Sequence, residues 1–186
     1  MNIPNILTSA RIVMIPVCVA IYYIPAWWAG LAASAIFILA AITDWLDGYL
    51  ARKLDQSTPF GAFLDPVADK LIVAAALVVL VETHASFWLT IPAVIIIGRE
   101  IVISALREWM AELGKRASVA VSMVGKVKTA MQMTAIAILL AALPGSWLAD
   151  IGVYGLGLLL LQASAVLTLW SMFVYLRAAW PEIHWE

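Results

Sequence analysis

Long apolar runs recur along this chain, and they restrict its fold more than any other feature does. Residues 29–42 read AGLAASAIFILAAI, and residues 71–81 read LIVAAALVVLV. The chain is 65% hydrophobic and 12% charged, whereas a soluble domain is usually about 45–50% apolar and about 25% charged. A lipid bilayer is therefore the expected solvent. Alternating strand patterns are absent, and open sheets are not viable in lipid, so the spans are predicted to be helices.

The sequence predicts an all-α integral membrane protein that forms a single polytopic domain over residues 1–186. The six expected transmembrane helices cover about 7–26, 29–50, 61–82, 87–110, 119–142 and 152–178. The N-terminus lacks the basic region and cleavage site of a signal peptide, so the first apolar run is expected to be retained as a span. Cys18 is the only cysteine, which excludes an intramolecular disulfide.

The distribution of basic residues predicts how the helices are oriented. The second-to-third and fourth-to-fifth connections carry basic residues, and so do both ends of the chain, whereas the other three connections contain no Lys or Arg. The positive-inside rule then places both termini in the cytoplasm. The net charge of −1 identifies no partner, and no nucleic-acid partner is expected.

Four aspartates lie at the inner edges of the second and third predicted spans. Asp44 and Asp47 are three residues apart, and Asp65 and Asp69 are four apart, so each pair shares one face of a helix. If the two spans form an antiparallel hairpin, Asp47 lies level with Asp65 and Asp44 lies level with Asp69. All four carboxylates are then expected to converge on one small volume near the cytoplasmic surface.

Converging carboxylates need positive charge, because they repel one another and are costly to bury without partners. Arg52, Lys53 and Lys70 are nearby, but divalent cations match the site better. No His or Cys lies within 44–70, so oxygen ligands favour Mg²⁺ or Mn²⁺ over zinc. Four carboxylates suit two ions about 3.5–4 Å apart, as used in phosphoryl transfer. Solvated helix caps and a proton or ion pathway through a transporter are the alternatives.

Small and basic residues accompany the acids. Gly48 follows Asp47 directly, and Gly61 precedes Asp65 by one helical turn. Glycine at such positions lets a ligand approach the backbone, although it also lets membrane helices pack closely. Arg52 lies one turn beyond Gly48, where a guanidinium can hold a phosphate or mark the cytoplasmic side.

This stretch resembles the signature of the CDP-alcohol phosphatidyltransferases. The pattern is Asp-x2-Asp-Gly-x2-Ala-Arg-x8-Gly-x3-Asp-x3-Asp, and all eight of its positions are present: Asp44, Asp47, Gly48, Ala51, Arg52, Gly61, Asp65 and Asp69. The six expected helices also agree with that family. The stretches NIPNILTSAR and GREIVISALREWMAELGKR resemble the bacterial members that make phosphatidylglycerophosphate from CDP-diacylglycerol and sn-glycerol 3-phosphate.

The resemblance implies a role for each position in the hairpin 44–69. It implies four ligands of two Mg²⁺ or Mn²⁺ ions: Asp44, Asp47, Asp65 and Asp69. Asp69 is also implied to be the general base. The CDP part of the lipid donor is implied to bind at Gly48, Ala51, Arg52 and Gly61, with Asn5 and Thr8 as further candidates. Helix capping is the alternative role of Asn5.

A phosphorylated acceptor requires further cations. Arg99, Arg107 and Lys126 lie in or beside apolar runs, where charged side chains are expected to face the bundle interior or a wet cavity. We expect these three residues to bind the acceptor phosphate, and ion pairs with acidic residues of the same segment, such as Glu100, are the alternative.

The resemblance therefore implies an enzyme of phospholipid biosynthesis in the bacterial inner membrane, acting among membrane lipids. A homodimer is implied as well. The hairpin alone does not separate glycerol 3-phosphate from another acceptor, such as inositol phosphate or serine, although basic residues disfavour serine. An ion or proton transporter is the alternative outside the family, but broken mid-membrane helices typical of transporters are not found.

Overall fold

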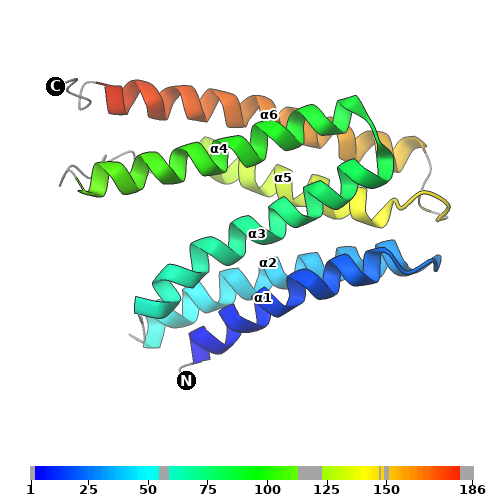
Figure 1. Ribbon diagram of the computed structural model, residues 1–186, viewed down its shortest axis with the longest axis horizontal. Helices are drawn as coiled ribbons and strands as arrows, with labels where there is room; N and C mark the ends of the chain where they lie inside the picture. The colour runs from blue at the N-terminus through cyan, green and yellow to red at the C-terminus, as the bar shows by residue number, and fades with distance from the viewer. Residues whose placement is uncertain (1–2, 55–58, 113–122, 147, 149–150, 181–186) are drawn as a thin grey trace.

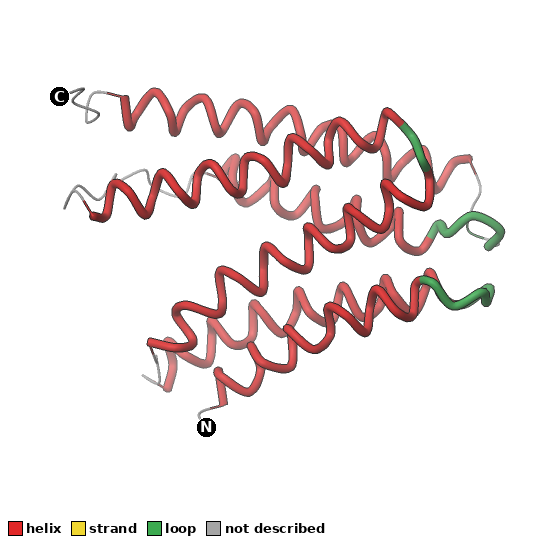
Figure 2. The backbone as a smooth tube through the Cα atoms, viewed as in Figure 1, coloured by secondary structure: helices red, strands yellow, loops and turns green. Residues whose placement is uncertain are grey.

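The computed structural model describes residues 3–54, 59–112, 123–146, 148 and 151–180. In this part of the chain all regular structure is helical (Figures 1 and 2). The helices are α1 (Ile3–Tyr22), α2 (Ala29–Leu54), α3 (Pro59–His84), α4 (Phe87–Glu112), α5 (Met123–Ala141) and α6 (Ile151–Ala179). The predicted all-α fold with six helical segments is confirmed.

The helix boundaries follow local chemistry. Helix α3 begins with Pro59, a residue favoured at the first helical position because the missing N–H would have no intrahelical partner there. The turn after α5 contains Gly145 with φ of +86°, a conformation that glycine adopts without steric cost. Helix α2 continues to Leu54, past the expected end near residue 50, so the acidic segment on this side is fully helical.

The helix ends are arranged as the distribution of basic residues predicts. Figure 1 shows the beginnings of α1 and α3 and the ends of α2, α4 and α6 at one end of the bundle. The α1–α2 and α3–α4 connections, the end of α5 and the beginning of α6 lie at the opposite end. The end that carries the basic residues also carries the acidic hairpin, and we refer to it as the basic end.

The sequence suggests that the second and third helices pack directly against each other, but in the structure α1 packs against both of them. It packs extensively against α2 and also against α3, whereas α2 and α3 contact each other only slightly. Helices α5 and α6 form the other closely packed pair, and α4 packs on α6. Because α1 packs against both helices, α2 and α3 are not in close contact. Their carboxylates, those of Asp44 and Asp69, instead contact a residue of α1.

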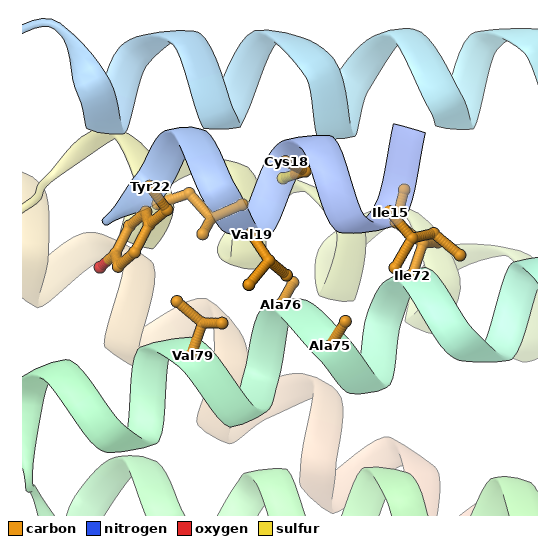
Figure 3. Close-up of a pocket in the computed structure, with 9 residues that line it drawn as sticks. Ile15, Cys18, Val19, Tyr22, Ile72, Ala75, Ala76 and Val79 are labelled. Carbon is orange, nitrogen blue, oxygen red and sulfur yellow. The ribbon is translucent and has the colours of Figure 1, made fainter. Parts of the chain in front are cut away.

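The core lies between the helices and is formed by large aliphatic and aromatic side chains. Fully buried examples are Phe37, Leu77, Leu89, Ile136 and Leu161. A narrow apolar cavity separates α1 from α3 and is lined by Cys18, Tyr22, Ile72 and Val79, among others (Figure 3). The lone cysteine is thus a core residue.

The outer surface is unusually apolar. Many large hydrophobic side chains point outward, among them Val13, Val78, Leu159 and Phe173, each at least 60% exposed. Exposed large apolar side chains in such number are typical of a surface that contacts a membrane or another protein. Among the described residues, two helices, α4 and α6, are long and apolar enough to cross a membrane, and Leu7–Tyr22 and Ala29–Asp44 are shorter apolar helical segments. Together these features indicate a membrane protein.

Candidate active site

Three helices meet at an acidic cluster near the basic end of the bundle. Arg11 of α1 is almost completely buried, and its Nη1 lies 2.9 Å from Oδ1 of Asp44 on α2. The same nitrogen lies 2.7 Å from Oδ1 of Asp69 on α3. Because both carboxylates contact one nitrogen atom, Asp44 and Asp69 lie close together, as the antiparallel register predicts. Their side chains are 43% and 46% exposed, so they remain accessible from outside the protein.

A second contact between α1 and α3 lies one turn nearer the N-terminus. The hydroxyl of Thr8 donates a hydrogen bond of 2.6 Å to Oδ1 of Asp65. Thr8 is buried at 1% exposure. Thr8 and Arg11 are three residues apart, so they share a face of α1, and that face contacts the two aspartates of α3.

Several predicted residues lie outside the described side chains. For five of them the structure describes only the backbone, which is helical: Asn5, Asp47, Gly48, Ala51 and Arg52. Gly61 is described and is buried in α3, one turn before Asp65. The predicted contribution of Asp47 to the cluster, and the proposed CDP contacts of the other residues, therefore stay predictions.

The chemistry of the described carboxylates fits a hard divalent cation. Asp44 and Asp69 provide oxygen donors only, and they already converge on a positive charge; oxygen ligands are what Mg²⁺ and Mn²⁺ prefer. Among the residues that the structure describes, no group of three His, Cys, Asp or Glu side chains is arranged to hold a metal ion. A complete ligand set would thus need a further donor, such as Asp47.

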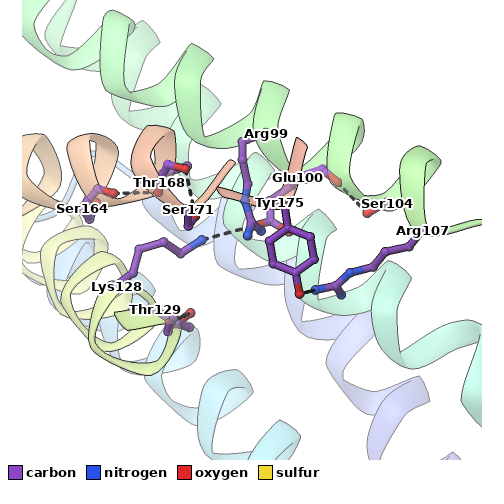
Figure 4. Close-up of polar contacts among 11 residues, drawn as sticks. Arg99, Glu100, Ser104, Arg107, Lys128, Thr129, Ser164, Thr168, Ser171 and Tyr175 are labelled. Carbon is purple, nitrogen blue, oxygen red and sulfur yellow. Dashed lines mark hydrogen bonds and ion pairs between the residues drawn. The ribbon is translucent and has the colours of Figure 1, made fainter. Parts of the chain in front are cut away.

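A second polar cluster joins α4 and α5 deeper in the bundle (Figure 4). Nη1 of Arg99 lies 2.9 Å from Oε1 of Glu100, and Nζ of Lys128 lies 3.5 Å from the same oxygen. All three side chains are less than 30% exposed. One carboxylate therefore compensates two buried cations, which leaves the cluster with a net positive charge. Nε of Arg99 has no hydrogen-bond partner among the described residues.

Arg107 lies two turns beyond Arg99 on α4 and contacts a different helix. Its Nη2 donates a hydrogen bond of 2.7 Å to the hydroxyl of Tyr175 on α6. Its guanidinium carbon also lies 5.1 Å from the centroid of the Tyr175 ring, a separation at which a cation–π attraction operates. Tyr175 therefore contacts Arg107 through both its hydroxyl and its ring, and Figure 4 shows the pair on the same side of α4 as Arg99.

The three residues expected to bind the acceptor phosphate, Arg99, Arg107 and Lys126, do not form one cluster in the structure. Arg99 makes the ion pair with Glu100 that was the alternative to phosphate binding. Lys126 is exposed, whereas Lys128 is buried at 4% exposure and joins Arg99. Since the two lysines are two residues apart, they point to different sides of the helix.

Sequence reasoning assigned no site role to Arg11 and Tyr175, and it chose Lys126 rather than Lys128, although the structure places all three at these clusters. Arg11 is one of the basic residues near the chain ends that predict orientation, but it is also a lone charge inside an apolar run and lies one turn after Thr8. That spacing was an available signal. Lys128 and Tyr175 depend on helix rotation and on contacts between distant segments, for which one sequence provides no direct signal.

Comparisons with known proteins agree with the family resemblance of the acidic stretch 44–69. The family model described as CDP-alcohol phosphatidyltransferase matches residues 1–176. A protein of Pseudomonas fluorescens, named CDP-diacylglycerol–glycerol-3-phosphate 3-phosphatidyltransferase, is 56% identical over 186 residues, which cover 98% of this chain and 92% of the relative. Proteins of the same name from Shigella flexneri (serotype 5b) and Escherichia coli K12 are each 57% identical over 178 residues, covering 96% of this chain and 94% of the relative. The chain therefore belongs to the CDP-alcohol phosphatidyltransferase family.

Proposed function

We propose that this protein transfers the phosphatidyl group of CDP-diacylglycerol to sn-glycerol 3-phosphate, giving phosphatidylglycerophosphate and CMP. The observation that carries the proposal is the identity of 56–57%, over nearly the whole chain, with relatives named for this reaction. The relatives and the apolar surface agree that the enzyme works on a lipid. We take residues 1–186 as one polytopic domain and the hairpin 44–69 as its metal and CDP site.

The donor lipid is proposed to bind with its pyrophosphate beside the acidic cluster. The family generally depends on divalent metal ions, and Asp44, Asp47, Asp65 and Asp69 are the proposed ligands of two Mg²⁺ or Mn²⁺ ions. Such ions would offset the negative charge of the pyrophosphate and of the departing CMP. The CDP part would contact Gly48, Ala51, Arg52 and Gly61, with Asn5 and Thr8 beside them.

An apolar groove on α2 is a candidate site for the acyl chains of the donor. The groove lies between α2 and α5 and is lined by Phe37, Ile38, Ile42 and Ile138, among others. Ile38 and Ile42 are 45% and 52% exposed, so the groove opens outward, toward the expected lipid. Ile42 precedes Asp44 by two residues along α2, so one end of the groove lies at the depth of the acids but on a different side of α2.

Asp69 is the proposed general base. Its carboxylate is about half exposed, so a soluble acceptor can approach it. Asp69 would take the proton from the C1 hydroxyl of glycerol 3-phosphate while that oxygen bonds to the phosphorus bearing diacylglycerol. The bond from this phosphorus to the CMP oxygen breaks, and CMP leaves with the electron pair. General-base assistance of this kind contributes roughly 10²–10⁴-fold.

The acceptor phosphate is proposed to bind between α4, α5 and α6. Arg99, Arg107 and Lys126 were expected to bind it, and the buried position of Lys128 adds a fourth cation. The net positive charge of the cluster of Arg99, Glu100 and Lys128 suits a dianion, and a guanidinium matches the geometry of phosphate oxygens. The buried Nε of Arg99 is a donor that such a ligand would satisfy.

The proposed location is the bacterial inner membrane, with six spans and with both termini and the active site facing the cytoplasm. The positive-inside rule supports this orientation, because the described helix ends next to the basic residues share one end of the bundle. The family resemblance also implies a homodimer, which light scattering in detergent would measure.

A panel of acceptors tests the proposed reaction. Purified protein would be supplied with CDP-diacylglycerol, Mg²⁺ or Mn²⁺, and glycerol 3-phosphate, inositol phosphate or serine in turn. CMP release is expected with glycerol 3-phosphate only, and EDTA is expected to stop it. Faster release with another acceptor would refute the acceptor assignment, and full activity in EDTA would refute the metal requirement.

A further inference from the structure

We propose that Arg11 is a positioning residue that holds Asp44 and Asp69 in the geometry required for divalent-metal binding. The inference rests on the proposed function, because it assumes that these two carboxylates are metal ligands. It starts from an unusual placement: a guanidinium buried at 1% side-chain exposure, in contact with carboxylates from two other helices. Arg11 thus connects α1, α2 and α3 at one point.

The packing of the helices explains why such a connection is needed. Helices α2 and α3 contact each other only slightly, and α1 packs against both. The two helices therefore do not fix the separation of their carboxylates by direct packing. Two ionised carboxylates brought together also repel each other. A cation on the intervening helix both opposes that repulsion and fixes each side chain relative to α1.

A carboxylate can serve Arg11 and a metal ion at the same time. The contacts of Arg11 Nη1 with Asp44 and Asp69 are both with Oδ1 atoms, and a carboxylate has a second oxygen with its own lone pairs. Groups that hydrogen-bond to metal-ligating carboxylates orient them, and their loss typically lowers metal affinity by about 10–100-fold. Thr8, which donates to Asp65 from the same face of α1, extends the same arrangement to a third aspartate.

Binding of Mn²⁺ to the full-length protein in detergent, without lipid substrate, tests the inference. Electron paramagnetic resonance would measure free Mn²⁺ during titration. We expect Arg11→Gln to lower Mn²⁺ affinity by about 10–100-fold. Arg11→Lys is expected to restore most of the affinity, because a single nitrogen makes both contacts and an ammonium offers three donors. Equal or tighter binding by Arg11→Gln would overturn the inference, and tighter binding would show that the guanidinium competes with the metal.

Two control variants separate positioning from charge loss and from general destabilisation. Arg177→Gln removes an exposed cation from the end of α6, on the other side of the bundle, and is expected to leave Mn²⁺ affinity unchanged. Leu89→Ala removes a buried side chain of α4 from the hydrophobic core of the bundle, and it is expected to lower the melting temperature without changing Mn²⁺ affinity. A loss of affinity in Leu89→Ala equal to that in Arg11→Gln would contradict a specific role for Arg11.

The outcome also distinguishes this inference from the proposed function. A wild-type protein that binds Mn²⁺ and catalyses the reaction, with an unaffected Arg11→Gln variant, overturns only the role of Arg11. A wild-type protein that binds no Mn²⁺ overturns the metal site and the inference together. If Arg11→Gln does not fold into a monodisperse protein, Arg11→Lys decides: affinity near wild type supports the inference, and a loss of tenfold or more overturns it.

Discussion

At the scale of single residues, charge pairing explains how a very apolar bundle contains acids and bases. Asp44 and Asp69 share the buried guanidinium of Arg11, and Arg99 and Lys128 share the carboxylate of Glu100. Breaking such a pair leaves an uncompensated charge, which is strongly destabilising inside a protein. The first cluster has an excess of negative charge and the second an excess of positive charge. This separation suits a reaction in which cations bind at one cluster and a phosphorylated acceptor at the other.

Asp69→Asn is expected to abolish CMP release, because an amide cannot accept the proton of the attacking hydroxyl. The loss should be at least about 10²-fold, the lower end of general-base contributions. Glu82→Gln is the matched control, since it changes an acid of the same helix, α3, at the opposite end of the bundle. Release of CMP would be measured with Mg²⁺ or Mn²⁺ present, and retained turnover in Asp69→Asn would exclude Asp69 as the base.

Arg107→Ala is expected to raise the KM for glycerol 3-phosphate more than the KM for CDP-diacylglycerol. Loss of a charged contact to phosphate is worth roughly 1.5–3 kcal/mol, or about 10–100-fold in affinity. Tyr175→Phe is expected to raise the same KM by a smaller factor, because it removes the hydrogen bond to Arg107 but retains the aromatic ring. Steady-state kinetics with each substrate varied in turn would measure both effects, and equal increases for the two substrates would refute the acceptor pocket.

At the scale of elements, the long apolar runs predicted the helices, whereas the packing between the helices was less predictable. The six segments and the register of Asp44 with Asp69 follow from the apolar runs and the residue spacing. The insertion of α1 between α2 and α3 does not, because apolar helices of similar composition give no signal about which neighbours they choose. For the same reason Lys128, rather than the expected Lys126, is buried beside Arg99: that choice depends on how α5 is rotated.

Close packing at Gly30 gives a test of the helix arrangement. A Cβ atom at Gly30 on α2 would lie 2.6 Å from the carbonyl oxygen of Leu140 and 2.8 Å from Cβ of Leu143. Gly30→Ala is therefore expected to destabilise the protein by about 1–3 kcal/mol, the usual cost of overpacking. Gly155→Ala on α6 is the control, because no atom lies within 4 Å of its added Cβ. Thermal unfolding in detergent would measure both, and equal stabilities would contradict the contact between α2 and the end of α5.

At the scale of the whole molecule, the orientation of the bundle in the expected membrane determines which side the active site faces. Cysteine labelling tests this arrangement, because the lone Cys18 is buried and is expected to react little. In intact spheroplasts, Pro25→Cys in the α1–α2 connection is expected to react with a membrane-impermeant thiol reagent. Ala111→Cys, at the basic end of α4, is expected to react only after permeabilisation. The reverse pattern would place the active site outside the cytoplasm.

The central claim is that carboxylates from α2 and α3 form a divalent-metal site beside α1. The most direct test is anomalous X-ray scattering from crystals of the protein grown with Mn²⁺. We predict anomalous peaks within coordination distance, about 2.0–2.6 Å, of carboxylate oxygens of Asp44 and Asp69. Anomalous peaks only at other sites, with Asp44 and Asp69 contacting Arg11 and no ion, would contradict it.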